Sequence, residues 1–436
     1  MTETVDKHIE STTTPATTLL TDQYIQHEKL NNEEFKLWKK SVPLLYETIQ
    51  TYVLDSPSLT VQSLPKYELS FDKNEIDINL LLGTFSSIYS TNSKEYLKHD
   101  IIRLPSTLSS NIHNSIPIEI NSSISNKKKL RNIYKWELNS IQINKVRFNK
   151  SNNTIATSLL NGDIEIFKFD QSNPIITLKS DNNGKVNNAL EWGINNDYLL
   201  SGGEDTNITL WDLSKSSTNY KKTIYETHDS IVNDVSWNHS ITSLFGSVSD
   251  DLSIQFHDLR SSNKSIPLIK ISNGHDDSIN SIEFNPSLEN LFVTGSSDNL
   301  IKVWDLRNVS NPIRILYGHT NSINNLKFNP SKGSTNLLAS SSNDKRINIW
   351  DLNKLNIDYD ESDYIKNENS DPSLIFIHGG HTGKINEFDW VENLENVIVS
   401  VGEDNLLQIW KPSLEDDEDE DEDDEEEEET QNQDQV

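Results

Sequence analysis

The chain repeats itself, and this repeat constrains the fold more than any other feature. Six copies of an apolar-x-apolar-ring pattern end at Phe167, Trp211, His257, Trp304, Trp350 and Trp410. The spacings between these positions are 44, 46, 47, 46 and 60 residues. A unit this short cannot bury both of its own faces, so neighbouring copies must stack and share a core. The repeat therefore predicts one array of similar units rather than several unrelated domains.

The inside of each copy predicts four short strands. Alternating apolar stretches such as Ile279–Phe284 and Ile323–Phe328 are typical of strands, and runs of small residues ending in Asp mark turns. A period of roughly 40–45 residues that ends in Trp-Asp is typical of WD40 blades. We therefore expect an all-β fold, a seven-bladed WD40 β-propeller, with an N-terminal α-helix and a disordered acidic C-terminal tail.

Six blades are plain, and the seventh must be assembled from weaker signals. Leu80–Leu82 with Tyr96–Leu104 supplies this degenerate blade. The strand around Ser58–Leu64 is expected to complete the last blade and lock the ring. The expected boundaries are a disordered N-terminus at 1–25, a helix at 26–55, the propeller at 56–413 with an acidic insertion at 352–373, and a disordered tail at 414–436.

A His and an Asp recur in the repeats and resemble a catalytic set. The pairs are His228 with Asp250, His275 with Asp298, His319 with Asp344, and His381 with Asp404. An active site occurs once, whereas these residues recur, so we expect a buried hydrogen-bond network in each blade. The sequence contains no nucleophile elbow, P-loop or zinc-protease motif. We predict no catalytic residue, no cofactor and no enzymatic activity.

Charge and composition exclude several classes of partner. The formal net charge is −30, and the unbroken acidic run Glu415–Glu429 supplies 15 of the negative charges. Nucleic-acid binding needs clustered cations, so we expect a basic partner instead. The absence of Cys excludes disulfides and thiolate metal sites. No signal peptide or long apolar run is visible, and we expect a soluble intracellular protein.

The first segment outside the repeat is Asn31–Leu54. Its apolar residues recur at steps of three or four, which predicts an amphipathic helix with one face on the propeller. They are Phe35, Trp38, Val42, Leu45, Ile49 and Val53. Leu30, Leu37 and Leu44 form a second apolar line. This line is either a wider buried stripe or one wall of a groove for a partner helix.

The second segment outside the repeat is the insertion that lengthens the last spacing. Its acids are Asp358, Asp360, Glu361, Asp363, Glu368 and Asp371. The simplest interpretation is a solvated loop. However, the insertion leads into the apolar stretch Leu374–Ile377. Carboxylates beside an apolar edge suit a basic amphipathic helix, whose cations pair with the acids while its apolar face is buried.

Three stretches carry a resemblance to a known family. They are Glu33–Lys40 followed by Pro43–Tyr46, then Pro57–Pro65, and Phe376–Thr382. With the repeats, they resemble the histone-binding WD40 chaperones of the retinoblastoma-binding type, from about Asn32 to Ser413. Within that family, Val42–Tyr46, Ser58–Gln62 and Gln408–Ser413 are most similar to the second subunits of type B histone acetyltransferases.

The resemblance implies two histone sites. A side groove between the helix and the acidic loop would hold the first helix of histone H4. The residues implied there are Leu30, Glu34, Asp358, Asp360, Glu361, Asp363, Glu368, Asp371, Phe376 and Ile377. The top face would hold the histone H3 tail at Asn144 and Asn280. Gln142, Val186 and Asn233 replace acids of the family, so tail binding is expected to be weak.

The function that the resemblance implies is that of a non-catalytic histone-binding subunit. It would present histone H4 to a separate acetyltransferase catalytic subunit, in the cytoplasm and nucleus. No direct nucleic acid, membrane or small-molecule substrate is expected. One alternative is the small histone-binding subunit of a chromatin assembly or deacetylase complex. Another is a WD40 substrate receptor of a ubiquitin ligase, although no adaptor-binding segment is visible.

Overall fold

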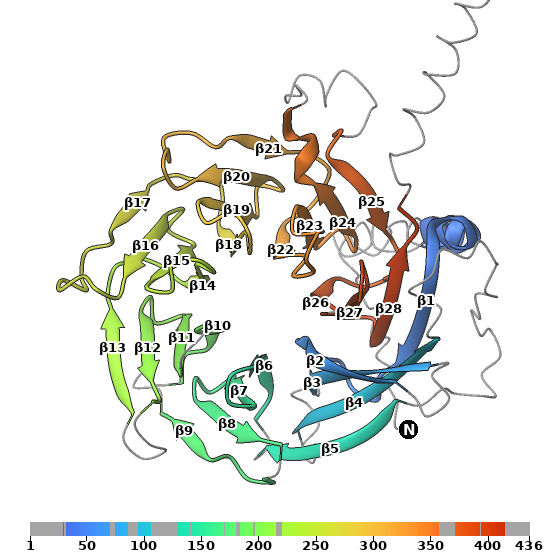
Figure 1. Ribbon diagram of the computed structural model, residues 1–436, viewed down its shortest axis with the longest axis horizontal. Helices are drawn as coiled ribbons and strands as arrows, with labels where there is room; N and C mark the ends of the chain where they lie inside the picture. Colours follow the sequence, from blue (N-terminus) through green and yellow to red (C-terminus); the bar gives the residue numbers. More distant parts are fainter. Residues whose placement is uncertain are drawn as a thin grey trace, which may run out of the picture.

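The computed structural model is a closed ring of seven antiparallel sheets with four strands each, arranged as blades around one axis (Figure 1). It describes residues 29, 32–69, 75–85, 95–105, 130–138, 141–169, 171–179, 184–194, 197–214, 220–356, 371–392 and 394–414. The predicted seven-bladed propeller is confirmed. Within the described ranges, no helix is long and apolar enough to cross a membrane.

Helical residues precede the ring at 29 and 32–45, and one short 3-10 helix, η2, covers Leu352–Asn356. The strands of the first four blades are β2 (Val61–Leu69), β3 (Glu75–Gly83), β4 (Glu95–Pro105), β5 (Arg131–Leu138), β6 (Ile143–Asn149), β7 (Thr154–Leu159), β8 (Ile164–Lys168), β9 (Ile176–Leu178), β10 (Asn187–Trp192), β11 (Tyr198–Gly203), β12 (Ile208–Asp212), β13 (Lys221–Tyr225), β14 (Val232–Trp237), β15 (Leu244–Ser249), β16 (Ile254–Asp258) and β17 (Ile269–Ile271). The strands of the last three are β18 (Ile279–Phe284), β19 (Leu291–Ser296), β20 (Ile301–Asp305), β21 (Arg314–Leu316), β22 (Ile323–Phe328), β23 (Leu337–Ser342), β24 (Ile347–Asp351), β25 (Leu374–His378), β26 (Ile385–Trp390), β27 (Ile398–Gly402), β28 (Leu406–Pro412) and β1 (Tyr46–Val53).

The core lies between neighbouring blades, which explains the small residues in each repeat. The second strands β7 and β15 are buried at all six positions, because another blade covers each of their faces. Gly202 and Gly295 occupy matching positions in two blades. A Cβ on either would lie 2.7 Å from Val232 or Ile323 on the first strand of the next blade. Small side chains here therefore set the distance between blades.

The ring closes with a different strand from the one expected. The outer strand of the last blade is β1, which pairs with β28 from Tyr46 opposite Pro412 to Val53 opposite Leu406. The prediction that residues around Ser58–Leu64 close the ring is wrong, because Val61 begins β2, the first strand of the first blade.

This closure also corrects the length of the predicted helix. The helix ends at residue 45 instead of 55, and β1 starts at the next residue. Thr48, Ile49, Thr51 and Val53 are β-branched, which lowers helix propensity and favours a pleated strand. The unpaired edge of β28 supplies the partner that such a strand needs. The apolar periodicity of the segment therefore crosses two kinds of secondary structure.

Candidate functional site

The repeated His and Asp residues form a structural network inside the blades. In the blade β18–β21, His275 Nδ1 lies 2.8 Å from an Asp298 oxygen, and its Nε2 lies 2.8 Å from Thr294 Oγ1. Trp304 Nε1 donates to the same hydroxyl at 2.9 Å. Burial opposes ionisation of Asp298, but the hydrogen bond to His275 prevails and the pKa of Asp298 lies below its usual value. Every polar group named here has a partner, as expected for a structural motif.

The same network recurs in three other blades, with one change of register. His319 contacts Asp344 and Ser340, and His381 contacts Asp404 and Ser400. His228 contacts Asp251 at 2.9 Å, not the expected Asp250. The Asp250 carboxylate instead accepts a hydrogen bond from Asn233, on the first strand of the same blade.

The N-terminal helix is anchored to the ring by one directed chain of hydrogen bonds. Trp38 Nε1 donates to Tyr46 Oη at 2.9 Å, and the Tyr46 hydroxyl lies 2.8 Å from His378 Nδ1. His378 Nε2 lies 2.9 Å from Gln408 Oε1, and Gln408 Nε2 donates to the Gly380 carbonyl at 2.9 Å. Since the Trp38 nitrogen can only donate, the Tyr46 hydroxyl donates to His378. Three segments far apart in sequence are thereby joined.

Burial keeps both titratable members of this chain neutral. Removal from water raises the pKa of Tyr46 above its usual value, and the same effect lowers the pKa of His378 well below its usual value. The His378 ring stacks on Trp410 with centroids 4.2 Å apart. A Cβ on Gly380 would lie 2.7 Å from His378 Cε1, so this glycine admits the imidazole. The helix is thus held rigidly against the last two blades.

One flank of this helix faces solvent with apolar side chains. The face with Trp38 and Val42 packs on the ring, whereas Leu37 and Leu44 are 62% and 83% exposed. Successive helix residues turn by about 100°, which places Glu34 on the same flank as both leucines. Glu34 Oε1 lies 3.9 Å from Arg346 Nη2, in the turn before β24. Of the two interpretations of the second apolar line, the geometry therefore favours a partner groove for Leu37 and Leu44.

The residues predicted for the side groove fall into three groups. Glu34 and Ile377 lie at the surface, and Ile377 on β25 is 40% exposed. Phe376 is only 7% exposed and packs against Tyr46, so it supports the groove from below instead of lining it. The predicted residues outside the described ranges are Leu30, Asp358, Asp360, Glu361, Asp363 and Glu368.

Asp371 is a correction to the predicted groove. Its side chain is fully buried, and its carboxylate accepts hydrogen bonds from Ser373 N, Ser373 Oγ and Tyr317 N at 3.0, 2.6 and 3.3 Å. Arg314 Nη2 lies 3.7 Å away. A carboxylate already used in this way cannot bind a partner at the surface. Asp371 instead fixes the chain where the insertion rejoins the propeller.

The top face carries a series of asparagines that sequence reasoning identified only in part. An Asn occupies the bulge on the first strand of six blades, at 144, 188, 233, 280, 324 and 386. The Asn144 amide donates to the Asn187 carbonyl at 2.9 Å, and the Asn280 amide donates to the Ile323 carbonyl at 2.7 Å. Each bond reaches the next blade. The amino groups of Asn144 and Asn280 are therefore occupied in joining blades.

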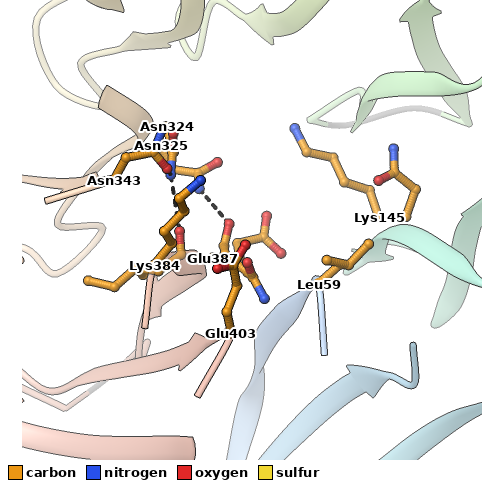
Figure 2. A pocket seen from close by; sticks show the side chains of 11 residues that line it. Leu59, Lys145, Asn324, Asn325, Asn343, Lys384, Glu387 and Glu403 are labelled. Atoms are coloured by element: carbon orange, nitrogen blue, oxygen red, sulfur yellow. Dashed lines mark hydrogen bonds between the residues drawn. The ribbon is translucent and has the colours of Figure 1, made fainter. Parts of the chain in front are cut away.

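A pocket of about 270 Å³ lies among these asparagines (Figure 2). Its lining comprises Leu59, Asn144, Lys145, Asn324, Asn325, Asn343, Lys384, Ile385, Asn386, Glu387 and Glu403. Asn144 is part of it, whereas Asn280, the other residue predicted for the top face, is not.

Below the pocket, ion pairs connect inner strands of different blades. They are Arg147 with Glu387 at 2.7 Å, Lys145 with Asp234 at 3.3 Å, and Lys327 with Asp389 at 2.8 Å. Burial opposes ionisation of Glu387, but the three cations around it lower the pKa of Glu387 to about 2. Sequence reasoning missed these pairs, although charges alternating with apolar residues on inner strands were the available signal. Among the described residues, no three His, Asp or Glu side chains are placed to hold a metal ion.

Two family models match the chain. The first is described as the histone-binding protein RBBP4 or the corresponding component of the CAF1 complex, and it matches residues 33–105, which include most of the N-terminal helix and β1–β4. The WD domain, G-beta repeat model matches residues 172–212, 267–305 and 310–351. The matched parts are thus the irregular N-terminal segment and three of the regular blades.

The chain is also similar to two known proteins along most of its length. Histone acetyltransferase type B subunit 2 of Candida glabrata is 33% identical over 389 residues, which cover 88% of this chain and 88% of the relative. The protein of the same description from Debaryomyces hansenii is 32% identical over 396 residues, which cover 88% of this chain and 92% of the relative.

Proposed function

The chain belongs to the family of histone acetyltransferase type B subunit 2 proteins, and we propose that it holds histone H4 for a separate acetyltransferase subunit without catalysing the reaction itself. Tethering raises the local concentration of the substrate at the catalytic chain. The His-Asp sets support the non-catalytic role, because each is saturated inside its own blade.

The observation that carries this proposal is the exposed flank of the N-terminal helix. Leu37 and Leu44 offer apolar area, and Glu34 offers a carboxylate on the same flank. An amphipathic helix binds such a groove through apolar residues at steps of three and four, while its cations pair with acids. The acids of the insertion would add to Glu34. This chemistry suits the cationic first helix of histone H4.

The test is binding of a peptide spanning the first helix of histone H4 to the full chain. Reversing the charges of Asp358, Asp360, Glu361 and Asp363 to lysine should weaken binding at least tenfold, about 1.4 kcal/mol. The matched control reverses four exposed acids elsewhere: Glu226, Asp229, Glu289 and Glu395. An equal loss in both variants would mean that only net charge matters, and no loss in either would reject the groove.

The wider assignment covers partners and compartment. The proposal places the chain in the cytoplasm and nucleus, with histone H4 and an acetyltransferase catalytic chain as partners and the histone H3 tail as a weak ligand of the top face. Affinity purification from cells tests this, with recovery of an acetyltransferase chain as the expected result. Recovery of deacetylase or chromatin-assembly subunits, or of a ubiquitin ligase adaptor in its place, would overturn it.

A further inference from the structure

The top-face pocket is sized for one side chain. Its volume of about 270 Å³ lies below the roughly 300–1,000 Å³ of small-molecule sites. Figure 2 shows Lys384 beside Asn324, Asn325 and Asn343 on one side, with Lys145 and Leu59 on the other. A side chain entering between them meets two ammonium groups.

The charges around the pocket do not favour a cation. Lys384 is exposed, and its ammonium group has no hydrogen bond or ion pair within the described part of the chain. Lys145 is 3.3 Å from Asp234, at the far end of its reach. The pocket acid Glu387 is buried and already binds Arg147, Thr60 Oγ1 and the Val61 amide. A lysine or arginine side chain entering here would find no free buried carboxylate to pair with.

The amide groups of the lining are fixed in one orientation. Asn324 Nδ2 donates to the Ile385 carbonyl at 3.2 Å, Asn325 Nδ2 to the Asn386 carbonyl at 2.9 Å, and Asn386 Nδ2 to the Ser58 carbonyl at 2.9 Å. With each amino group held by a neighbouring carbonyl, the side-chain oxygens remain as acceptors. The pocket therefore combines amide acceptors with the ammonium donor of Lys384.

We propose that this pocket binds an uncharged, amide-bearing side chain, N-acyl-lysine, and discriminates against free lysine. The amide N–H of the ligand donates to an asparagine oxygen, and its acyl oxygen accepts from Lys384. Leu59 and Ile385 supply apolar contact for the methyl group. Free lysine is disfavoured because a third ammonium group would lie near two others without a carboxylate to compensate. The inference rests on the proposed function only for the source of acylated lysine.

The test uses three twelve-residue peptides of Gly, Ser, Ala and Thr with one central residue: lysine, Nε-acetyl-lysine or glutamate. Titration into the full chain, followed by NMR of the labelled peptide, should show the acetylated form binding at least fivefold tighter than the lysine form. Lys384→Glu should reverse this order, because the new carboxylate attracts the free amine. Lys332→Glu is the matched control on an exposed loop between β22 and β23, and it should leave the order unchanged.

Several results would overturn the proposal. These are equal binding of the acetylated and free forms, preference of the unaltered chain for free lysine, no binding of any peptide, or an equal response to Lys332→Glu. Tighter binding of the glutamate peptide would show that the two lysines attract anions instead. The histone H4 helix peptide, titrated into the same samples, separates this outcome from the side groove: intact H4 binding would leave the proposed function standing while the pocket inference fails.

Discussion

The blade β18–β21 and the flank formed by the N-terminal helix, β1 and β25 are both held by buried polar chains, but they differ in origin. In the blade, His275, Asp298, Thr294 and Trp304 are neighbours within one repeat. In the flank, Tyr46 and His378 are 332 positions apart. The blade's network is therefore rebuilt wherever the repeat recurs, whereas the flank's chain occurs once and depends on ring closure.

This difference explains why the flank is the candidate for partner binding. A motif present in several blades cannot by itself mark one place on the ring. The flank breaks the symmetry of the ring, and it leaves Leu37 and Leu44 exposed on an anchored helix. The regular blades provide stiffness, and the single irregular element provides a location.

The largest expected effect is on the regular network. His275→Ala leaves the buried carboxylate of Asp298 and the hydroxyl of Thr294 without a partner. The free energy of unfolding should fall by about 3 kcal/mol, as measured by urea denaturation. Binding of the H4 helix peptide at low temperature should be unchanged, since the flank is intact. A loss below 1 kcal/mol would contradict a structural role.

A smaller effect is expected when the flank's chain is cut. Tyr46→Phe removes the hydroxyl between Trp38 and His378 while keeping the aromatic packing. We expect a loss of about 2 kcal/mol and weaker binding of the H4 helix peptide, because the helix is less firmly held. Tyr52→Phe is the control, since its hydroxyl bonds only Gln50. Equal effects of the two variants on binding would reject the anchoring role.

The flank should also respond to acid through His378. Burial lowers the pKa of His378, so the folded state keeps it neutral while the unfolded state takes up a proton below the ordinary value of 6.5. Its contribution to stability is therefore present above pH 6.5 and lost as the pH falls. Relative to His378→Gln, the unaltered chain should lose up to ~1.4 kcal/mol per pH unit below 6.5. Parallel stability curves for the two proteins would refute this.

One defect in the blade next to the flank offers a stabilising change. Asn348 is buried, and neither of its side-chain polar atoms has a hydrogen bond. At the matching position of other blades, Gln255 and Gln408 donate to the Thr227 and Gly380 carbonyls. Asn348→Gln adds the missing methylene and should raise stability by ~1 kcal/mol, seen as a higher melting temperature. A lower melting temperature would mean that the site lacks room.

The smallest effect on stability is expected at the exposed end of the helix. Leu44→Ser should change the free energy of unfolding by less than ~0.5 kcal/mol, because this side chain is 83% exposed. It should nevertheless weaken binding of the H4 helix peptide severalfold, as apolar area is lost from the groove. Val53→Ser, at an exposed site on β1, is the control. Unchanged binding in the Leu44 variant would place the groove elsewhere.

The regular part of the molecule was readable from the sequence, since each blade states its pattern anew. The same periodicity misled at the N-terminal segment, where spacing continued from helix into strand and Tyr46–Val53 was assigned to the helix. A spacing pattern reports which side chains face the core, but not which edge strand awaits a partner. Asp371 failed for a similar reason, because an acid in an acidic stretch carries no sign of burial.

The amino-acid sequence by itself determined the repeat, the number of blades and the hydrogen-bonding role of His and Asp, because these depend on contacts within one unit. Only the tertiary structure decided which strand closes the ring, that the Asn144 amide reaches the next blade, and that Lys384 and Lys145 face one pocket. These facts depend on closure of the ring, which brings together residues whose separation along the chain contains no information about their distance in space.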